Sequence, residues 1–163
     1  MMSADEFVSL YGGIYEHSPW VAEEAAADAA DCGSIERIAE IMAECVDNAS
    51  VERQLALIRA HPDLAGRAQV AGELTQDSTT EQSRAGLDQC SAEEYEQFQS
   101  LNDHYHDKFG FPFVMAVRDS SRAEILAAFA SRLEHDVNTE FETALAEIHK
   151  IATLRLRAME GDK

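Results

Sequence analysis

Basic residues are scarce in this sequence. It has 13 Lys and Arg against 31 Asp and Glu, which gives a formal net charge of -18. A surface of this sign repels phosphate backbones and anionic headgroups, so neither nucleic acid nor a membrane is an expected partner. It also repels small anions at long range, so a site for an anionic ligand requires local arginines.

Cysteines and long apolar runs are also scarce. The cysteines are Cys32, Cys45 and Cys90, an odd number without C-x-x-C spacing. This argues against a disulfide framework or a zinc site and favours a reducing compartment. The start, MMSADEF, lacks the apolar stretch of a signal peptide. The longest apolar run, 111–117, contains a proline and is too short to span a bilayer. We expect a cytoplasmic protein.

Sequence motifs for metals, nucleotides and activated serines are absent. HExxH, ExxH and paired helix carboxylates are missing, as are GxGxxG, the Walker pattern and GxSxG. His104 and His106 are two residues apart on an expected helix and point to different faces, so they do not share a metal. No metal site is expected.

The apolar pattern predicts helices. Apolar residues recur at spacings of three and four, and no segment shows sustained period-2 alternation. The S-x-x-E spacing of a capping box occurs at Ser3, Ser78, Ser91 and Ser121. Further expected N-caps are Ser18 (before Pro19), Ser34, Ser50 and Asn138. We predict an all-α helical bundle that forms one domain over residues 1–163.

Two stretches interrupt the helical pattern. The pair His61-Pro62 ends a helical run, because a residue before proline is pushed out of the α region. Residues 111–117 are apolar and β-prone without a partner strand, so we predict a buried extended segment there. Its backbone groups need partners. Either helix termini and waters supply them, or the segment lines a pocket and binds a polar ligand.

Three residues stand out as candidates for chemistry. Arg155 lies on the apolar face of the last helix, where it is either a buried ion pair, a snorkelling side chain or a ligand-binding group. Glu140 and Glu147 fall elsewhere on that helix, where we expect solvent. His61 at its helix break is either a packing residue or a general acid/base. Glu81 either completes a capping box with Ser78 or serves a site.

These motifs together resemble one family. The relevant stretches are GIYEHSPW (13–20), HPDLAGR (61–67), SxxEQ (78–82), AGL (85–87), LNxxY (101–105), FGFPF (109–113), EI (147–148) and LRL (154–156). They resemble 2-oxo-4-hydroxy-4-carboxy-5-ureidoimidazoline (OHCU) decarboxylase, the third enzyme of the route from urate to (S)-allantoin. The resemblance covers about Phe7 to Leu156.

The resemblance implies a helical enzyme without a cofactor, often a homodimer, acting on a small ureido-imidazoline carboxylate. Its catalytic histidine falls on His61 and the acidic partner of that histidine on Glu81. Its substrate-binding positions fall on Pro62, Ser78, Gln82 and Arg155, and on Phe113, Val114, Met115, Ala116 and Val117. Apolar walls from Phe111, Phe113 and Leu74 are a further expectation.

The sequence is also compatible with two other functions. The first is a different ureide enzyme on the same scaffold, such as a ring hydrolase or a racemase. A hydrolase commonly uses a metal or an activated nucleophile, and neither has a signal here. The second is a non-catalytic helical interaction module, in which His61, Glu81 and Arg155 matter only for stability or partner binding.

Overall fold

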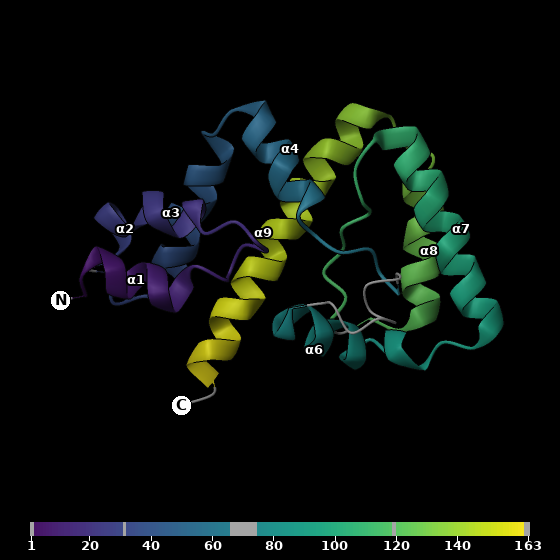
Figure 1. The fold of residues 1–163 in the computed structure, drawn as a ribbon, viewed down its shortest axis with the longest axis horizontal. Coiled ribbons are helices and arrows are strands. Elements are labelled where there is room, and N and C mark those ends of the chain that lie inside the picture. The colour runs from purple at the N-terminus through teal and green to yellow at the C-terminus, as the bar shows by residue number, and fades with distance from the viewer. Residues whose placement is uncertain (1, 31, 66–74, 119, 162–163) are drawn as a thin grey trace. The chain divides into compact units, whose positions relative to one another are not determined.

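The protein is built from helices (Figure 1). The structure, a computed structural model, describes residues 2–30, 32–65, 75–118 and 120–161. The helices in these ranges are α1 (Ala4–Tyr11), α2 (Trp20–Ala29), α3 (Ile35–Asp47), α4 (Val51–Arg59), α6 (Gln76–Arg84), the 3-10 turn η1 (Leu87–Gln89), α7 (Ala92–Phe109), α8 (Arg122–Arg132) and α9 (Val137–Gly161). No strand occurs within those ranges, which confirms the all-α prediction.

The described residues form two compact units. Unit 1 comprises residues 1–60 and 148–163, and unit 2 comprises residues 61–147. Helix α9 contributes residues to both units. The prediction that the chain is one domain stays a prediction. None of the helices in the described ranges combines the length and low charge of a bilayer span.

Unit 1 is helical, and three of its helices begin at serine N-caps. Helix α2 packs against α1 and α3. The side chains of Ser3, Ser34 and Ser50 each accept a hydrogen bond from the backbone N–H three residues on, which satisfies donors that the first turn leaves open. Fully buried side chains form the core: Phe7, Val21, Ala25, Val46, Leu57, Ile58 and Leu156.

Unit 2 is organised around aromatic side chains. Ser91 with Glu94 and Ser121 with Glu124 form complete capping boxes at the starts of α7 and α8, as the sequence predicts. Helix α7 ends at Gly110, whose φ of 77° is the left-handed conformation that favours glycine. The buried ring of Tyr105 lies among Phe109, Phe111, Phe113 and Phe129. This cluster anchors the extended segment beyond the helix.

Three predicted N-caps are wrong. Ser18 does not cap α2, which begins at Trp20 with Pro19 at the N-cap position, and the Ser18 hydroxyl donates to the Glu16 C=O. Helix α6 begins at Gln76 with Thr75 as its N-cap, whose hydroxyl accepts from the Ser78 backbone N–H. Ser78 is therefore inside the first turn and is not the cap. Helix α9 begins at Val137, and the carboxylate of Asp136 accepts from the Thr139 N–H, so Asn138 lies within the helix. For α6 and α9, a polar residue two or three positions before the expected one caps the helix instead.

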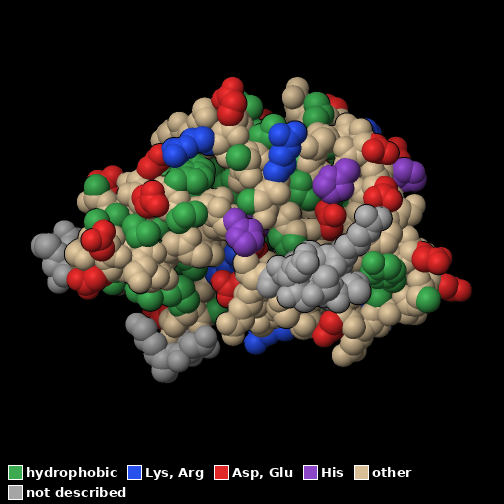
Figure 2. Space-filling view, in the orientation of Figure 1, with side chains coloured by type: hydrophobic (Ala, Val, Ile, Leu, Met, Phe, Trp, Pro, Cys, Tyr) green, Lys and Arg blue, Asp and Glu red, His purple; other side chains and the backbone are tan. Residues whose placement is uncertain are grey.

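The charge imbalance of the sequence is visible on the surface. Acidic side chains are scattered over the face shown in Figure 2, where lysine and arginine are few. Repulsion among these acidic side chains opposes the compact state.

Candidate active site

The predicted site residues fall in both units. Unit 2 contains His61, Pro62, Ser78, Glu81, Gln82 and the segment 111–117, and unit 1 contains Arg155. Gly66, Arg67 and Leu74, from the HPDLAGR motif and the expected apolar walls, lie outside the described residues. Each group is therefore described within its own unit.

His61 is buried at the start of a short non-helical segment, residues 61–65. Helix α4 ends at Arg59, and the His61 side chain is 7% exposed. Ala65, at the other end, has a φ of 50°, a left-handed conformation that costs a non-glycine residue about 1 kcal/mol. A strained backbone persists only where its surroundings hold it firmly. The 61–65 segment therefore needs specific partners, and the structure supplies them.

Gln82 of α6 is the first of these partners. Its Oε1 accepts from the Ala65 backbone N–H at 3.0 Å, and its Nε2 donates to the Asp63 backbone C=O at 3.3 Å. Ser78 lies one turn earlier on the same buried face of α6. The family resemblance implies that Gln82 contacts substrate. That role stays a prediction, while the geometry shows its amide engaged by the backbone of the segment that begins with His61.

Helix α7 supplies three more partners from one face. Gln99 Nε2 donates to the Ala65 C=O at 2.7 Å, and Asn102 Nδ2 donates to the Leu64 C=O at 3.0 Å. His106 Nε2 lies 2.8 Å from Asp63 Oδ1. Spacings of three and four residues place these side chains in one row along the helix. Sequence reasoning missed this clamp, although a polar Asn102 within an apolar stripe was a signal.

The capping explanation for Glu81 does not hold. A capping box requires the serine to be the N-cap and the glutamate to stand three residues into the helix. Because α6 begins at Gln76, Glu81 stands in its second turn. Its side chain is half-buried, next to the buried Gln82. Its predicted role as the acidic partner of His61 stays a prediction.

The 111–117 segment is not helical, as the sequence predicts, and side chains satisfy part of its backbone. Residues 112–117 have no regular secondary structure, and all but Met115 and Ala116 are buried. Arg132 donates to the Val114 C=O at 2.6 Å, and Glu147 Oε1 accepts from the Ala116 N–H at 3.2 Å. These partners were not anticipated, because the expected ones were helix termini and waters.

The two edges of this segment differ. Backbone groups of residues two apart in an extended chain point to the same edge, and those of the residue between point to the opposite edge. Val114 and Ala116 therefore share the edge bonded by Arg132 and Glu147. The N–H and C=O of Met115 belong to the other edge and form no hydrogen bond with any residue that the structure describes. That edge offers a donor and an acceptor side by side.

The expectation that Glu140 is solvated is wrong. Its side chain is fully buried and accepts from Tyr105 Oη at 2.6 Å, Arg132 Nε at 2.7 Å and His135 Nδ1 at 2.8 Å. Burial, and next the Glu140 hydrogen bond, raise the pKa of the Tyr105 phenol. A carboxylate removed from water requires this number of donors. The pattern of α9 alone did not show them, because all three donors lie before the helix.

Arg155 forms an ion pair within unit 1. The guanidinium is 5% exposed and donates to Glu16 Oε2 at 3.1 Å and to the Ile14 C=O at 3.2 Å. Glu16 is itself 2% exposed. Of the alternatives for Arg155, the snorkelling side chain is therefore wrong and the buried pair is present. A guanidinium has five N–H donors, so the pair does not preclude the predicted substrate role, which stays a prediction.

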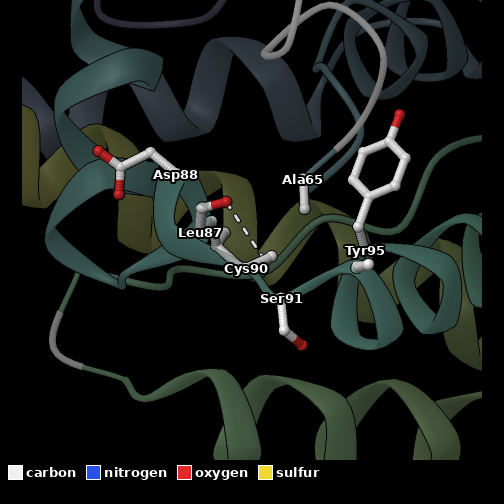
Figure 3. Close-up of a pocket in the computed structure, with 7 residues that line it drawn as sticks. Ala65, Leu87, Asp88, Cys90, Ser91 and Tyr95 are labelled. Carbon is white, nitrogen blue, oxygen red and sulfur yellow. Dashed lines mark hydrogen bonds between the residues drawn. The ribbon is translucent and has the colours of Figure 1, made fainter.

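A pocket in unit 2 contains a cysteine, but the surroundings of its thiol do not favour a nucleophile. It has a volume of about 460 Å³ and is lined by Ala65, Leu87, Asp88, Cys90, Ser91, Ala92 and Tyr95 (Figure 3). The Cys90 thiol donates to the Leu87 C=O. Burial and neighbouring Glu94 raise the pKa of that thiol, which disfavours the reactive thiolate. Among the described residues, no cluster of His, Cys, Asp and Glu is arranged to hold a metal.

Comparison with known proteins decides the family. A model of the OHCU decarboxylase family matches residues 1–157. The chain belongs to the OHCU decarboxylase family. The OHCU decarboxylase of Haloferax volcanii is 49% identical over 152 residues, which cover 93% of this chain and 88% of the relative. That of Halalkalicoccus jeotgali is 46% identical over 155 residues, which cover 95% of this chain and 85% of the relative.

Solved structures of this family have the same fold. A crystal structure of (S)-allantoin synthase matches with a TM-score of 0.75 and 37% identity, over 95% of this chain and 50% of that one. A crystal structure of OHCU decarboxylase in the presence of (S)-allantoin matches with a TM-score of 0.70 and 24% identity, over 86% of this chain and 89% of that one. The second likeness bears on the fold alone.

Proposed function

We propose that this protein decarboxylates OHCU and protonates the product to (S)-allantoin without a cofactor. The observation that carries the proposal is the match of the OHCU decarboxylase family over residues 1–157. The buried His61 on a clamped backbone supports it, because a general acid/base must be held in one place. The activity is that of a carboxy-lyase in urate degradation.

The substrate itself explains why no cofactor is needed. The carbon that loses CO₂ carries a hydroxyl group and adjoins a C=N bond. As the C–C bond to the carboxylate breaks, its electron pair forms a C=C bond to the neighbouring carbon, and the C=N π pair moves onto nitrogen. That nitrogen takes up one proton, and the resulting enol becomes a carbonyl as its hydroxyl loses a proton and the neighbouring carbon gains one. The protein therefore has to orient the ring, stabilise charge and deliver one proton.

We assign acid/base chemistry to His61 and Glu81. The imidazole of His61 hydrogen-bonds the substrate hydroxyl and transfers protons at neutral pH. The carboxylate of Glu81 sets the charge state of that imidazole. Gln82 and the α7 side chains Gln99 and Asn102 hold the 61–65 backbone in its strained conformation. They therefore fix the position of the backbone that carries the His61 side chain.

We assign substrate binding to protein groups that complement the hydrogen-bonding groups of OHCU. The Met115 N–H and C=O form a donor–acceptor pair that complements an HN–C=O unit of the ureido group or ring, and neighbouring backbone of residues 113–117 extends this surface. Pro62, Ser78 and Gln82 complete the contacts in unit 2. Arg155 holds a carboxylate or ureido oxygen as a planar fork. We further propose a cytoplasmic homodimer.

A circular-dichroism time course tests the activity. OHCU is made in situ from urate with the two upstream enzymes, in buffer containing a metal chelator. Rapid growth of the optical signal of (S)-allantoin supports both the reaction and its stereochemistry. Decay at the same rate as without the protein, from a sample shown to be folded by its helical spectrum, contradicts the proposal and favours the non-catalytic module. A different product identifies another ureide enzyme.

A further inference from the structure

We propose that Arg132 is a positioning residue that determines which edge of the 111–117 segment meets the substrate. Arg132 lies outside the residues that the family resemblance assigns to the site. The proposal rests on the proposed function, because it concerns the backbone to which substrate binding is assigned. Its steps depend on contacts within unit 2 alone.

The guanidinium of Arg132 is fixed from several directions. Its side chain is buried and donates through Nε to Glu140 at 2.7 Å, through one terminal nitrogen to the Val114 C=O at 2.6 Å and through the other to Tyr105 Oη at 3.4 Å. Its central carbon lies 4.3 Å from the centre of the Phe113 ring. A planar group held at each nitrogen and on one face cannot rotate without breaking a contact. The direction of the Val114 C=O is therefore set by a rigid donor.

Arg132 holds the segment through a side chain as well as through its backbone. The Phe113 ring is stacked between Arg132 and Phe129, whose ring centre is 3.9 Å away at an interplanar angle of 10°. Rotation of the peptide after Val114 would move its C=O away from Arg132 and turn the Met115 N–H toward the core. With the contact intact, the N–H and C=O of Met115 belong to the opposite edge.

Stability alone does not account for a charged pair in this place. Burying an ion pair costs several kcal/mol of desolvation per ion, and well-packed apolar replacements are often neutral or stabilising. Glu140 and Arg132 are both buried, yet the arginine uses only one of its contacts on that carboxylate. Two others, to the Val114 C=O and the Phe113 ring, orient the 111–117 segment, and a third reaches Tyr105 Oη. This division of contacts is what a positioning role requires.

Arg132→Lys in the full-length protein tests the proposal. Lysine keeps a positive charge beside Glu140 but lacks the planar fork that reaches both Glu140 and the Val114 C=O. We expect KM for OHCU to rise about tenfold, the effect of losing one charge-assisted hydrogen bond. We expect kcat to fall by less than about threefold, because the acid/base groups on the 61–65 segment and α6 are unchanged. A purely structural role changes the amount of folded protein without this split.

Arg122→Lys is the matched control. Arg122 donates through Nε to Glu94 at 2.8 Å and through a terminal nitrogen to the Gly86 C=O at 2.9 Å, so it repeats the Arg132 pattern at another loop of unit 2. Its KM is expected to stay within about twofold of the wild-type value. Hydrogen exchange of the peptide covering 111–117 should rise in R132K and not in R122K.

The outcomes separate the two proposals. If the wild-type protein does not act on OHCU, the proposed function fails. If it is active and R132K has the same KM as R122K, the positioning role is overturned. Should R132K not fold, Tyr105→Phe replaces it, since this change removes only the hydroxyl shared by Arg132 and Glu140. A KM about threefold higher is then expected, and an unchanged KM overturns the role.

Discussion

Gln82 Oε1 accepts a hydrogen bond from the Ala65 backbone N–H at 3.0 Å, across 17 positions of the chain. The other end of the same amide donates to the Asp63 C=O. A single buried side chain thus holds both flanks of Leu64, within a segment whose last residue has a positive φ. The backbone conformation of the segment that begins with His61 therefore depends on the Gln82 side-chain amide, which must both accept and donate a hydrogen bond.

Gln82→Glu should destabilise unit 2 and lower activity. The carboxylate has no donor for the Asp63 C=O and places two acceptors face to face in a buried setting. We expect a loss of about 1–3 kcal/mol in the free energy of unfolding, measured by urea denaturation, together with a lower kcat/KM. Gln97→Glu, on the exposed side of α7, is the control and should change neither. Equal stabilities for the two variants would contradict the clamp.

His61→Asn should abolish turnover and leave the fold intact. Asparagine retains a hydrogen-bonding group but cannot transfer a proton near neutral pH, and such groups contribute about 10²–10⁴-fold. His104→Asn, at an exposed position of the same unit, should keep the full rate. Rates come from the (S)-allantoin signal and folding from the helical dichroism. A folded His61→Asn protein with a near-normal rate would remove the acid/base assignment.

Variants of Arg155 and Glu16 distinguish a substrate-binding role of Arg155 from a purely structural one. Arg155→Ala leaves Glu16 as a buried unpaired charge, so a loss of about 3–5 kcal/mol in stability is expected. Glu16→Gln keeps the guanidinium and removes only the partner's charge. If Arg155 binds the substrate, KM should rise for Arg155→Ala and not for Glu16→Gln, measured at a temperature where both are folded. Unchanged KM in both variants makes the pair structural.

Local sequence signals were enough to predict the helical fold, but they did not reveal the contacts between residues that are distant in the sequence. Serine caps, the His61-Pro62 break and the Gly110 stop depend on neighbours within one turn, so the sequence shows them directly. The spacing of Ser78 and Glu81 predicts a capping box, but Thr75, three residues before Ser78, caps the helix.

The site was predictable only in part, for the same reason. The partners of Glu140 come from α7, α8 and the loop before α9, and those of the 61–65 segment come from α6 and α7. Which residues of α7 face Asp63 or Leu64 depends on how the helix lies against that segment, and no local pattern encodes this. The resemblance located the site residues, and the contacts that hold them required the structure.

Alkaline pH should destabilise the protein through two buried tyrosines. Burial raises the pKa of Tyr15, with Asp47 adding to it, and burial with the Glu140 hydrogen bond raises the pKa of Tyr105. The unfolded chain therefore loses these protons first, near pH 10. The stabilising contribution is complete below about pH 10 and is lost above it, by about 1.4 kcal/mol per pH unit for each phenol.

Ultraviolet titration with parallel far-ultraviolet dichroism checks this prediction. Both phenols should ionise only as the helical signal disappears. Tyr15→Phe and Tyr105→Phe should each flatten the alkaline decline in stability by one phenol's share, after correction for the lost hydrogen bonds. Ionisation of all the tyrosines in a fully helical protein would contradict the burial of these hydroxyls.

Salt should stabilise the protein, because its surface carries a formal net charge of -18. Like charges repel in the compact state, and salt shortens the range of that repulsion from about 10 Å at 0.1 M to about 3 Å at 1 M. Exposed pairs such as Arg37–Glu40 weaken at the same time, but pairs of this kind contribute little. The buried Arg132–Glu140 pair is screened much less. Repulsion therefore dominates the balance.

We expect Tm to rise between low salt and about 1 M NaCl, by about 2–4 °C for each kcal/mol of relieved repulsion. A variant with several exposed glutamates changed to glutamine, such as Glu36, Glu44, Glu52 and Glu96, should start with a higher Tm and gain less from salt. Sucrose, which favours compact states without screening charge, should stabilise both proteins equally. A Tm that falls with NaCl, or the same gain in both proteins, would show that surface repulsion is not the limiting electrostatic effect.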